Sequence, residues 1–164
     1  AYVDPTDKAS DAAFENALRR NPETYIAVAP PIEEGVNDSA ALIPSDQFRE
    51  SGKLASMEGQ SAPFNLGYRF PTESSFEGKV IPSISAGLAE YEGPAKEYRL
   101  DFGIDIHSIK RVSYIDVLQG RVERSTLKNA NVVVGQTFTG TSDMHYEPLG
   151  AKVPGVYFHA LGAH

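Results

Sequence analysis

Three consecutive valines, residues 132–134, end at Gly135 in the last third of this 164-residue chain. A short β-branched run closed by glycine is typical of a buried strand that turns sharply at its carboxyl end. A polar loop over residues 141–150 follows, and Pro154 then begins an amphipathic segment. Ligands of open α/β sheets bind in the crevice outside the carboxyl ends of the strands. The sequence therefore predicts a binding site in this polar loop.

Strand-like and helix-like segments alternate along the chain, and this alternation determines the predicted fold class. Helical spacing with capping or breaking residues predicts helices within residues 7–20, 44–50, 82–92 and 113–120. Apolar and alternating runs predict strands within residues 25–29, 65–71, 97–102 and 132–134. The acidic, turn-rich residues 32–41 predict an exposed loop. We therefore expect an α/β fold with one mainly parallel sheet, a single layer of about four to six strands flanked by helices.

The bulk properties of the chain exclude several classes of protein. Its length suits one domain with its own core, so we expect residues 1–164 to form a single domain. A formal net charge of −7 with scattered Lys and Arg argues against binding to nucleic acid and against docking on an anionic membrane surface. Because cysteine is absent, disulfides, thiol catalysis and Cys-based zinc sites are excluded.

Segments that target or anchor a protein are not recognisable in this sequence. No run approaches the roughly 18 apolar residues of a membrane span, and nothing resembles a signal peptide. The sequence begins at Ala1 instead of Met, so we expect a piece of a longer protein.

Asp143, His145 and Glu147 lie two residues apart in the predicted polar loop. In an extended loop, alternate side chains share a face, so this Asp-x-His-x-Glu pattern offers three ligands to one metal ion. The alternative is that Asp143 caps a turn while His145 is exposed, and we favour this alternative. We assign no metal, no cofactor and no catalytic residue from the pattern.

A second Asp-x-His pair, Asp105 and His107, lies between a predicted strand and a predicted helix. If neighbouring strand ends bring both pairs to one crevice, they form a four-ligand or acid–base cluster; the interpretation we favour is two independent turns. The segment 135–141 is similar to a phosphate loop but lacks the Lys of that motif. We select as candidate ligand contacts Asp143, His145, Asp105 and Thr137.

An ordered set of residues also carries a family resemblance. A strand ending in Gly is followed by an Asp, a Pro, a Pro-Gly-Val segment and a His-Ala pair. The residues are Val132, Val133, Val134, Gly135, Thr137, Asp143, Pro148, Leu149, Pro154, Gly155, Val156, His159 and Ala160. With the upstream segments 7–28 and 114–120, they resemble the type-two CHASE domain, a cyclase- and histidine-kinase-associated sensory extracellular domain. The chain is similar to a diverged or N-terminally trimmed member.

The resemblance implies an extracytoplasmic input domain of a bacterial membrane receptor. The output of such a receptor is a histidine kinase, an adenylate cyclase or a diguanylate cyclase, and residues 154–164 lead towards the membrane. It further implies a periplasmic or extracellular location, an unknown small ligand or protein signal, a membrane-anchored parent protein and a homodimer in the full-length receptor.

Three hypotheses of function are open at this point. The one we favour is a non-catalytic sensor whose ligand lies by the strand ends. The second is an α/β hydrolase-like or metal-assisted enzyme that uses Asp143 with His145 or His107, which requires these side chains to converge within hydrogen-bond reach. The third is a structural or dimerising module. It would expose an apolar face along Val156, Phe158 and Leu161.

Overall fold

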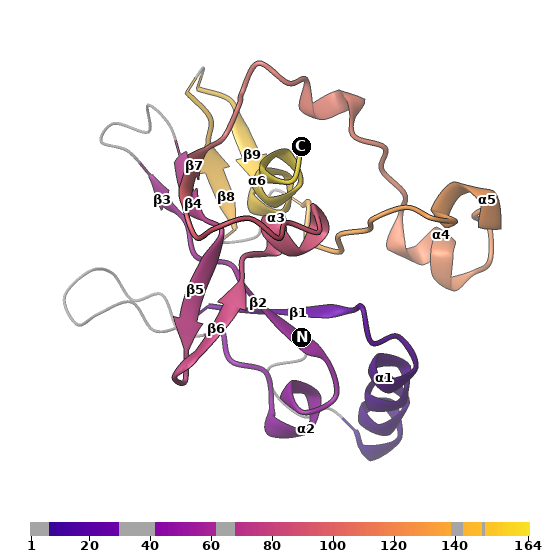
Figure 1. Ribbon diagram of the computed structural model, residues 1–164. Coiled ribbons are helices and arrows are strands. Elements are labelled where there is room, and N and C mark those ends of the chain that lie inside the picture. The colour runs from indigo at the N-terminus through magenta and orange to yellow at the C-terminus, as the bar shows by residue number, and fades with distance from the viewer. Residues whose placement is uncertain (1–6, 30–41, 62–67, 139–142, 149) are drawn as a thin grey trace.

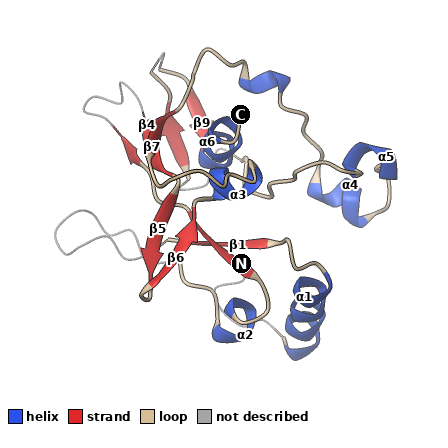
Figure 2. Cartoon of the chain, viewed as in Figure 1, coloured by secondary structure: helices blue, strands red, loops and turns tan. Residues whose placement is uncertain are grey.

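The fold is known from a computed structural model, which describes residues 7–29, 42–61, 68–138, 143–148 and 150–164. The helices in these ranges are α1 (Lys8–Arg20), α2 (Asp46–Arg49), α3 (Ile84–Leu88), α4 (Tyr114–Leu118), α5 (Arg124–Leu127) and α6 (Gly155–Gly162), with a 3₁₀ turn, η2, at Ile106–Ser108. The strands are β1 (Tyr25–Val28), β2 (Lys53–Ser56), β3 (Gln60–Ser61), β4 (Tyr68–Pro71), β5 (Glu73–Phe76), β6 (Lys79–Pro82), β7 (Glu97–Arg99), β8 (Met144–Tyr146) and β9 (Lys152–Pro154). Figure 1 follows these elements along the chain, and Figure 2 distinguishes helices from strands.

The strands form several small sheets, and most of these sheets are antiparallel. β1 and β2 pair in parallel, with Tyr25 opposite Lys53 and Val28 opposite Ser56. The order β3-β4-β7 makes an antiparallel sheet, and β5–β6 and β8–β9 are antiparallel hairpins. The prediction of one mainly parallel sheet flanked by helices is therefore wrong, because β1–β2 is the only parallel pair of strands in the described part of the chain.

A tight turn shows why the pattern of alternating elements was misleading. β5 and β6 are joined by Glu77 and Gly78, whose φ angles are 50° and 76°. Two successive residues with positive φ form the two-residue turn that holds hairpin strands antiparallel. Such turns usually contain Asn-Gly or Asp-Gly, whereas glutamate rarely adopts positive φ. The Glu-Gly pair at this position therefore gave no sequence signal for a hairpin.

The strand predicted at residues 132–134 is also wrong. These valines have no regular secondary structure, and the side chains of Val132 and Val134 are 51% and 76% exposed. No backbone hydrogen bond joins residues 132–134 to another described residue. A β-branched run favours a strand only where a neighbouring strand and a core are present to pair with it and cover it.

Other predicted elements are confirmed. The elements that fall inside their predicted ranges are α1, β1, α2, β4, β7 and α4. The helix predicted over residues 82–92 is shorter, because α3 ends at Leu88. The loop predicted over residues 32–41 lies outside the described residues, as do residues 65–67 of the strand predicted over 65–71. No helix of the described ranges is long and apolar enough to cross a lipid bilayer.

The N-terminal core forms where α1 and α2 pack on the parallel pair. Leu18 of α1, Ile26 of β1 and Phe48 of α2 are buried together. Helix α1 begins where the sequence predicts, because the carboxylate of Asp7 accepts hydrogen bonds from the backbone amides of Ala9 (3.1 Å) and Ser10 (2.9 Å).

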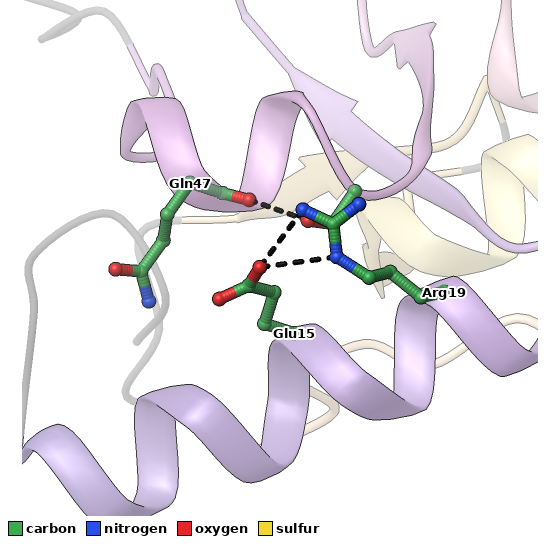
Figure 3. A network of polar contacts seen from close by, with 4 residues as sticks. Glu15, Arg19 and Gln47 are labelled. Atoms are coloured by element: carbon green, nitrogen blue, oxygen red, sulfur yellow. Dashed lines mark hydrogen bonds and ion pairs between the residues drawn. The ribbon is translucent and has the colours of Figure 1, made fainter.

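Polar contacts lie outside this core, on α1 and α2 (Figure 3). On α1, Nη2 of Arg19 is 2.9 Å from Oε1 of Glu15, one turn earlier. At the end of α2, the hydroxyl of Ser51 donates a 2.7 Å hydrogen bond to the carbonyl of Gln47. Because exposed ion pairs contribute little to stability, the buried apolar side chains dominate the energetics of this region.

Helix α6 forms the centre of the C-terminal half. It is buried on most of its circumference, so the amphipathic pattern predicted from residue 154 onward is wrong. Its buried residues are Gly155, Tyr157, Phe158, His159 and Leu161. Helix α3 packs against it, and the buried hydroxyl of Ser85 donates a 2.9 Å hydrogen bond to the carbonyl of His159. Gly162 permits the close approach, because a Cβ at this position would lie 2.5 Å from Oγ of Ser85.

Replacing Phe48 by alanine is expected to lower the free energy of unfolding by about 3–5 kcal/mol. The ring is 2% exposed and lies between Leu18 and Ile26, so its removal leaves a cavity. Equilibrium urea unfolding measures the loss. Val80→Ala is the matched control, because its side chain is 68% exposed and its loss should change stability by less than about 0.5 kcal/mol. Equal effects of the two variants would contradict this assignment of the core.

Candidate ligand-binding site

The polar segment predicted as a loop contains the first strand of a hairpin. Residues 144–146 form β8, so the loop prediction is wrong for them, while residues 141, 142 and 149 lie outside the described part of the chain. The register of β8 and β9 is Met144↔Pro154, His145↔Val153 and Tyr146↔Lys152. The amide of Gly155 donates a 2.9 Å hydrogen bond to the carbonyl of Asp143. The hairpin thus continues without a break into the first residue of α6.

Two of the selected side chains meet at the start of this hairpin. Nε2 of His145 lies 3.0 Å from Oδ1 of Asp143, because alternate residues of a strand project to the same face. The side chains are 43% and 37% exposed, so the pair is open to solvent. When the imidazole is neutral, the carboxylate favours the tautomer that carries its proton on Nε2, which leaves Nδ1 as a hydrogen-bond acceptor.

Asp143 also lies against the beginning of α6. A Cβ on Gly155 would lie 2.2 Å from Oδ1 of Asp143, so a side chain there would displace the carboxylate. The amino end of a helix carries a partial positive charge, which favours a nearby carboxylate. The position of the Asp143–His145 pair therefore depends on glycine at the first residue of α6.

Aromatic side chains of the core lie beside the imidazole of His145. The ring centroid of His145 is 5.4 Å from that of Phe158 and 6.2 Å from that of Tyr68. The phenol of Tyr68 donates a 2.9 Å hydrogen bond to the carbonyl of Tyr146, which ties β4 to β8. Burial raises the pKa of Tyr68, so its hydroxyl remains a donor at neutral pH. The pair thus has a rigid apolar side and a solvent-exposed polar side.

A second histidine, His159, lies in the core near the pair. It is 7% exposed, and its Nδ1 has no hydrogen-bond partner among the described residues. Its ring meets that of Phe70 edge to face, with centroids 5.6 Å apart. Burial lowers the pKa of His159 from 6.5 to about 4, while the charge of Asp143 raises it and that of His145 lowers it. The buried imidazole is therefore neutral at pH 7 and responds electrostatically to both members of the pair.

The other selected residues, Asp105 and Thr137, lie in two other segments of the chain. The carboxylate of Asp105 accepts a 2.8 Å hydrogen bond from the amide of His107 and caps η2, which is the independent turn that we favoured. Both residues are exposed. Thr137 is exposed in a segment without regular structure. The structure thus brings Asp143 and His145 together, while Asp105 and Thr137 remain predictions.

The geometry bears differently on the alternative hypotheses. In the described ranges, no group of three or more His, Asp or Glu side chains is placed to hold a metal ion. Asp143 and His145 meet the convergence condition set for an enzyme. The apolar face expected for a dimerising module is absent from α6, because Phe158 and Leu161 are 2% and 4% exposed and lie in the core.

Three residues that shape the site were not predicted from the sequence. They are Tyr68, Phe158 and His159. Tyr68 precedes Tyr146 by 78 residues, so no local pattern connects them. The apolar residues around His159 were a usable signal for a buried histidine, because a histidine in such a segment is desolvated when the helix is buried.

Comparison with known proteins gives one finding. A family model described as the CHASE2 domain matches residues 2–163, nearly the whole chain. No curated protein and no solved structure matches the chain.

Replacing His159 by leucine is expected to flatten the dependence of stability on pH. The unfolded chain binds a proton at this residue near pH 6.5, but the folded protein binds it only near pH 4. Stability from the neutral ring is therefore complete above pH 6.5 and falls by about 3 kcal/mol as the pH drops to 4. Chemical denaturation of the wild type and of His159→Leu across this range measures the difference. His107→Leu alters an exposed histidine and should keep the wild-type profile; parallel curves for the wild type and His159→Leu would refute the burial argument.

Proposed function

We propose that this chain, which belongs to the CHASE2 domain family, is the extracytoplasmic input domain of a membrane-bound signal-transduction protein. Its membership confirms the resemblance to type-two CHASE domains. CHASE2 domains are extracellular or periplasmic sensory domains of signal-transduction proteins. We extend this to the parent protein, which we propose to be a bacterial receptor anchored in the membrane, with a histidine kinase, an adenylate cyclase or a diguanylate cyclase as its output. Residues 1–164 then form a single sensory domain of that receptor.

The observation that carries the proposal is the family match over nearly the whole chain. The candidate site supports this proposal because it connects a polar pair of side chains to helix α6. Asp143 and His145 offer a carboxylate and an imidazole to a polar ligand, and their hairpin continues directly into α6. A ligand that binds one arrangement of this hairpin better than another shifts the population of α6 positions. We propose that α6 passes this shift towards the membrane.

The ligand in this proposal is a small polar molecule or ion that contacts Asp143 and His145. The pair supplies hydrogen-bond acceptors on the carboxylate and a group that donates or accepts according to its protonation. The phenyl ring of Phe158 and the anchored phenol of Tyr68 give the site a fixed apolar side. Small-ligand sites commonly combine apolar walls with a few placed polar groups.

The melting temperature of the purified protein should rise with one member of a panel of metal ions, nucleotides, amino acids and organic acids. A ligand at about 100 times its Kd stabilises the folded state by about 2.7 kcal/mol, which thermal denaturation detects. Asp143→Ala should abolish the shift because it removes the carboxylate from the pair. Asp101→Ala is the matched control, since it also removes an exposed turn carboxylate, one that accepts a 2.8 Å hydrogen bond from the amide of Gly103 and is not among the selected contacts. A melting-temperature shift that survives in Asp143→Ala would show that the ligand binds at another site.

An enzymatic function is a second candidate because His145 and Asp143 lie 3.0 Å apart, as in general acid–base pairs. We expect no turnover of ester, phosphate or glycoside substrates, in accord with the sensory character of the family. Chromogenic substrate panels test this directly. Turnover that is lost in both Asp143→Ala and His145→Ala, and retained in Asp101→Ala, would replace the sensor proposal with the enzymatic one.

A further inference from the structure

Residues 110–138, called the arm from here on, form a long segment without a core of its own. The arm carries α4 and α5, which project away from the other elements (Figure 1). No residue of the arm is buried. It leaves the core after Ile109, which packs against the C-terminal cluster, and it is tied back where Nδ2 of Asn131 donates a 2.7 Å hydrogen bond to the carbonyl of Leu88.

The arm holds most of the large apolar side chains that the described residues expose. Four of them lie on the short helix α4, and three lie in the extended return. They are Tyr114 (65% exposed), Ile115 (50%), Val117 (42%), Leu118 (63%), Val132 (51%), Val134 (76%) and Phe138 (60%). An apolar surface of this kind, held on ordered backbone, marks an interaction site more often than a solvated face.

The charge of the arm is opposite to that of the remainder of the chain. The arm has five Lys or Arg and two Asp or Glu, a formal charge of +3, whereas the chain as a whole has −7. All residues outside the arm therefore sum to −10. The side chain of Arg121 pairs with Asp116, but four exposed cations form no ion pair with a described residue. These cations are Lys110, Arg111, Arg124 and Lys128.

We propose that the arm is a dimerisation element whose exposed apolar side chains pack against the acidic body of a second copy of this chain. The charge distribution of the chain favours this occupant, because a basic arm and an acidic body of the same sequence are complementary. In a symmetric dimer each arm meets the other body, so the contact is made twice. The proposal is independent of any ligand at Asp143 and His145, which lie outside the arm.

The exposed area suits a contact between proteins. A Tyr or Phe side chain that is about two-thirds exposed offers on the order of 100 Å² of surface that a partner can cover. The seven apolar side chains and their basic rim, used twice, approach the roughly 1,600 Å² of a standard interface. The chain as a whole carries a formal charge of −7, which disfavours docking on an anionic membrane surface. A second protein surface is therefore the favoured occupant over a membrane.

The test is the oligomeric state of the full chain, measured by sedimentation velocity from about 1 µM to about 1 mM. The wild type should show a reversible monomer–dimer equilibrium that weakens with added salt, since charged pairs are screened. Leu118→Glu should raise the dimer Kd by at least about tenfold by placing a charge among the exposed apolar side chains of α4. Charge reversal at Lys110 and Arg111 should weaken the dimer further.

Gln119→Glu is the matched control, because Gln119 is exposed and lies beside Leu118 in the arm. It adds the same charge without removing an apolar side chain, so it should raise the dimer Kd far less than Leu118→Glu. Circular dichroism checks that both variants retain the fold, as expected for exposed positions.

Three outcomes would overturn the proposal. The first is a wild-type chain that stays monomeric over the whole concentration range. The second is a dimer that Leu118→Glu and Gln119→Glu affect equally. The third is binding of the monomer to phosphatidylglycerol vesicles that is lost in Leu118→Glu, which would assign the arm to a lipid surface.

Discussion

The packing of α6 against α3 is the constraint on which the C-terminal half depends. α6 is apolar on nearly all sides, so it is stable only when other elements surround it. Small residues set the distance between the two helices: Gly162 leaves room for Ser85, whose hydroxyl bonds the carbonyl of His159. A buried hydrogen bond of this kind fixes the rotation of α6 as well as its depth. Phe158 then faces the sheet aromatics, and the β8–β9 hairpin is held at the amino end of the helix.

The candidate site and the arm both follow from this packing. The pair of Asp143 and His145 sits where the hairpin enters α6, so movement of the pair is coupled to movement of the helix. The same helix holds the buried His159, whose neutral form the core requires. The arm leaves and rejoins the body near α3 and the C-terminal cluster, at Ile109 and Asn131. The polar candidate site thus lies on the hairpin, whereas the exposed apolar side chains lie on the arm.

Local signals predicted the elements that local interactions stabilise. Helix α1 and strand β1 are examples, because capping oxygens and apolar spacing act within a few residues. The β5–β6 hairpin was missed because Glu77 adopts positive φ without the usual turn residue. The valines of residues 132–134 carry a strong strand pattern but have neither a paired strand nor a covering core in the structure. The Asp-x-His pattern predicted two of the site residues, and the two such pairs are indistinguishable by sequence.

The sequence by itself determined the family, the absence of thiol chemistry, the acidic balance of the chain and the residue types of the candidate site. These follow from residue identity and short spacing. Only the tertiary structure decided that the sheets are small and mostly antiparallel, that Asp143 meets His145 at Gly155, and that the arm is exposed. Each of these depends on contacts between residues far apart in the chain. Their energies are set by burial and close packing, which no local pattern encodes.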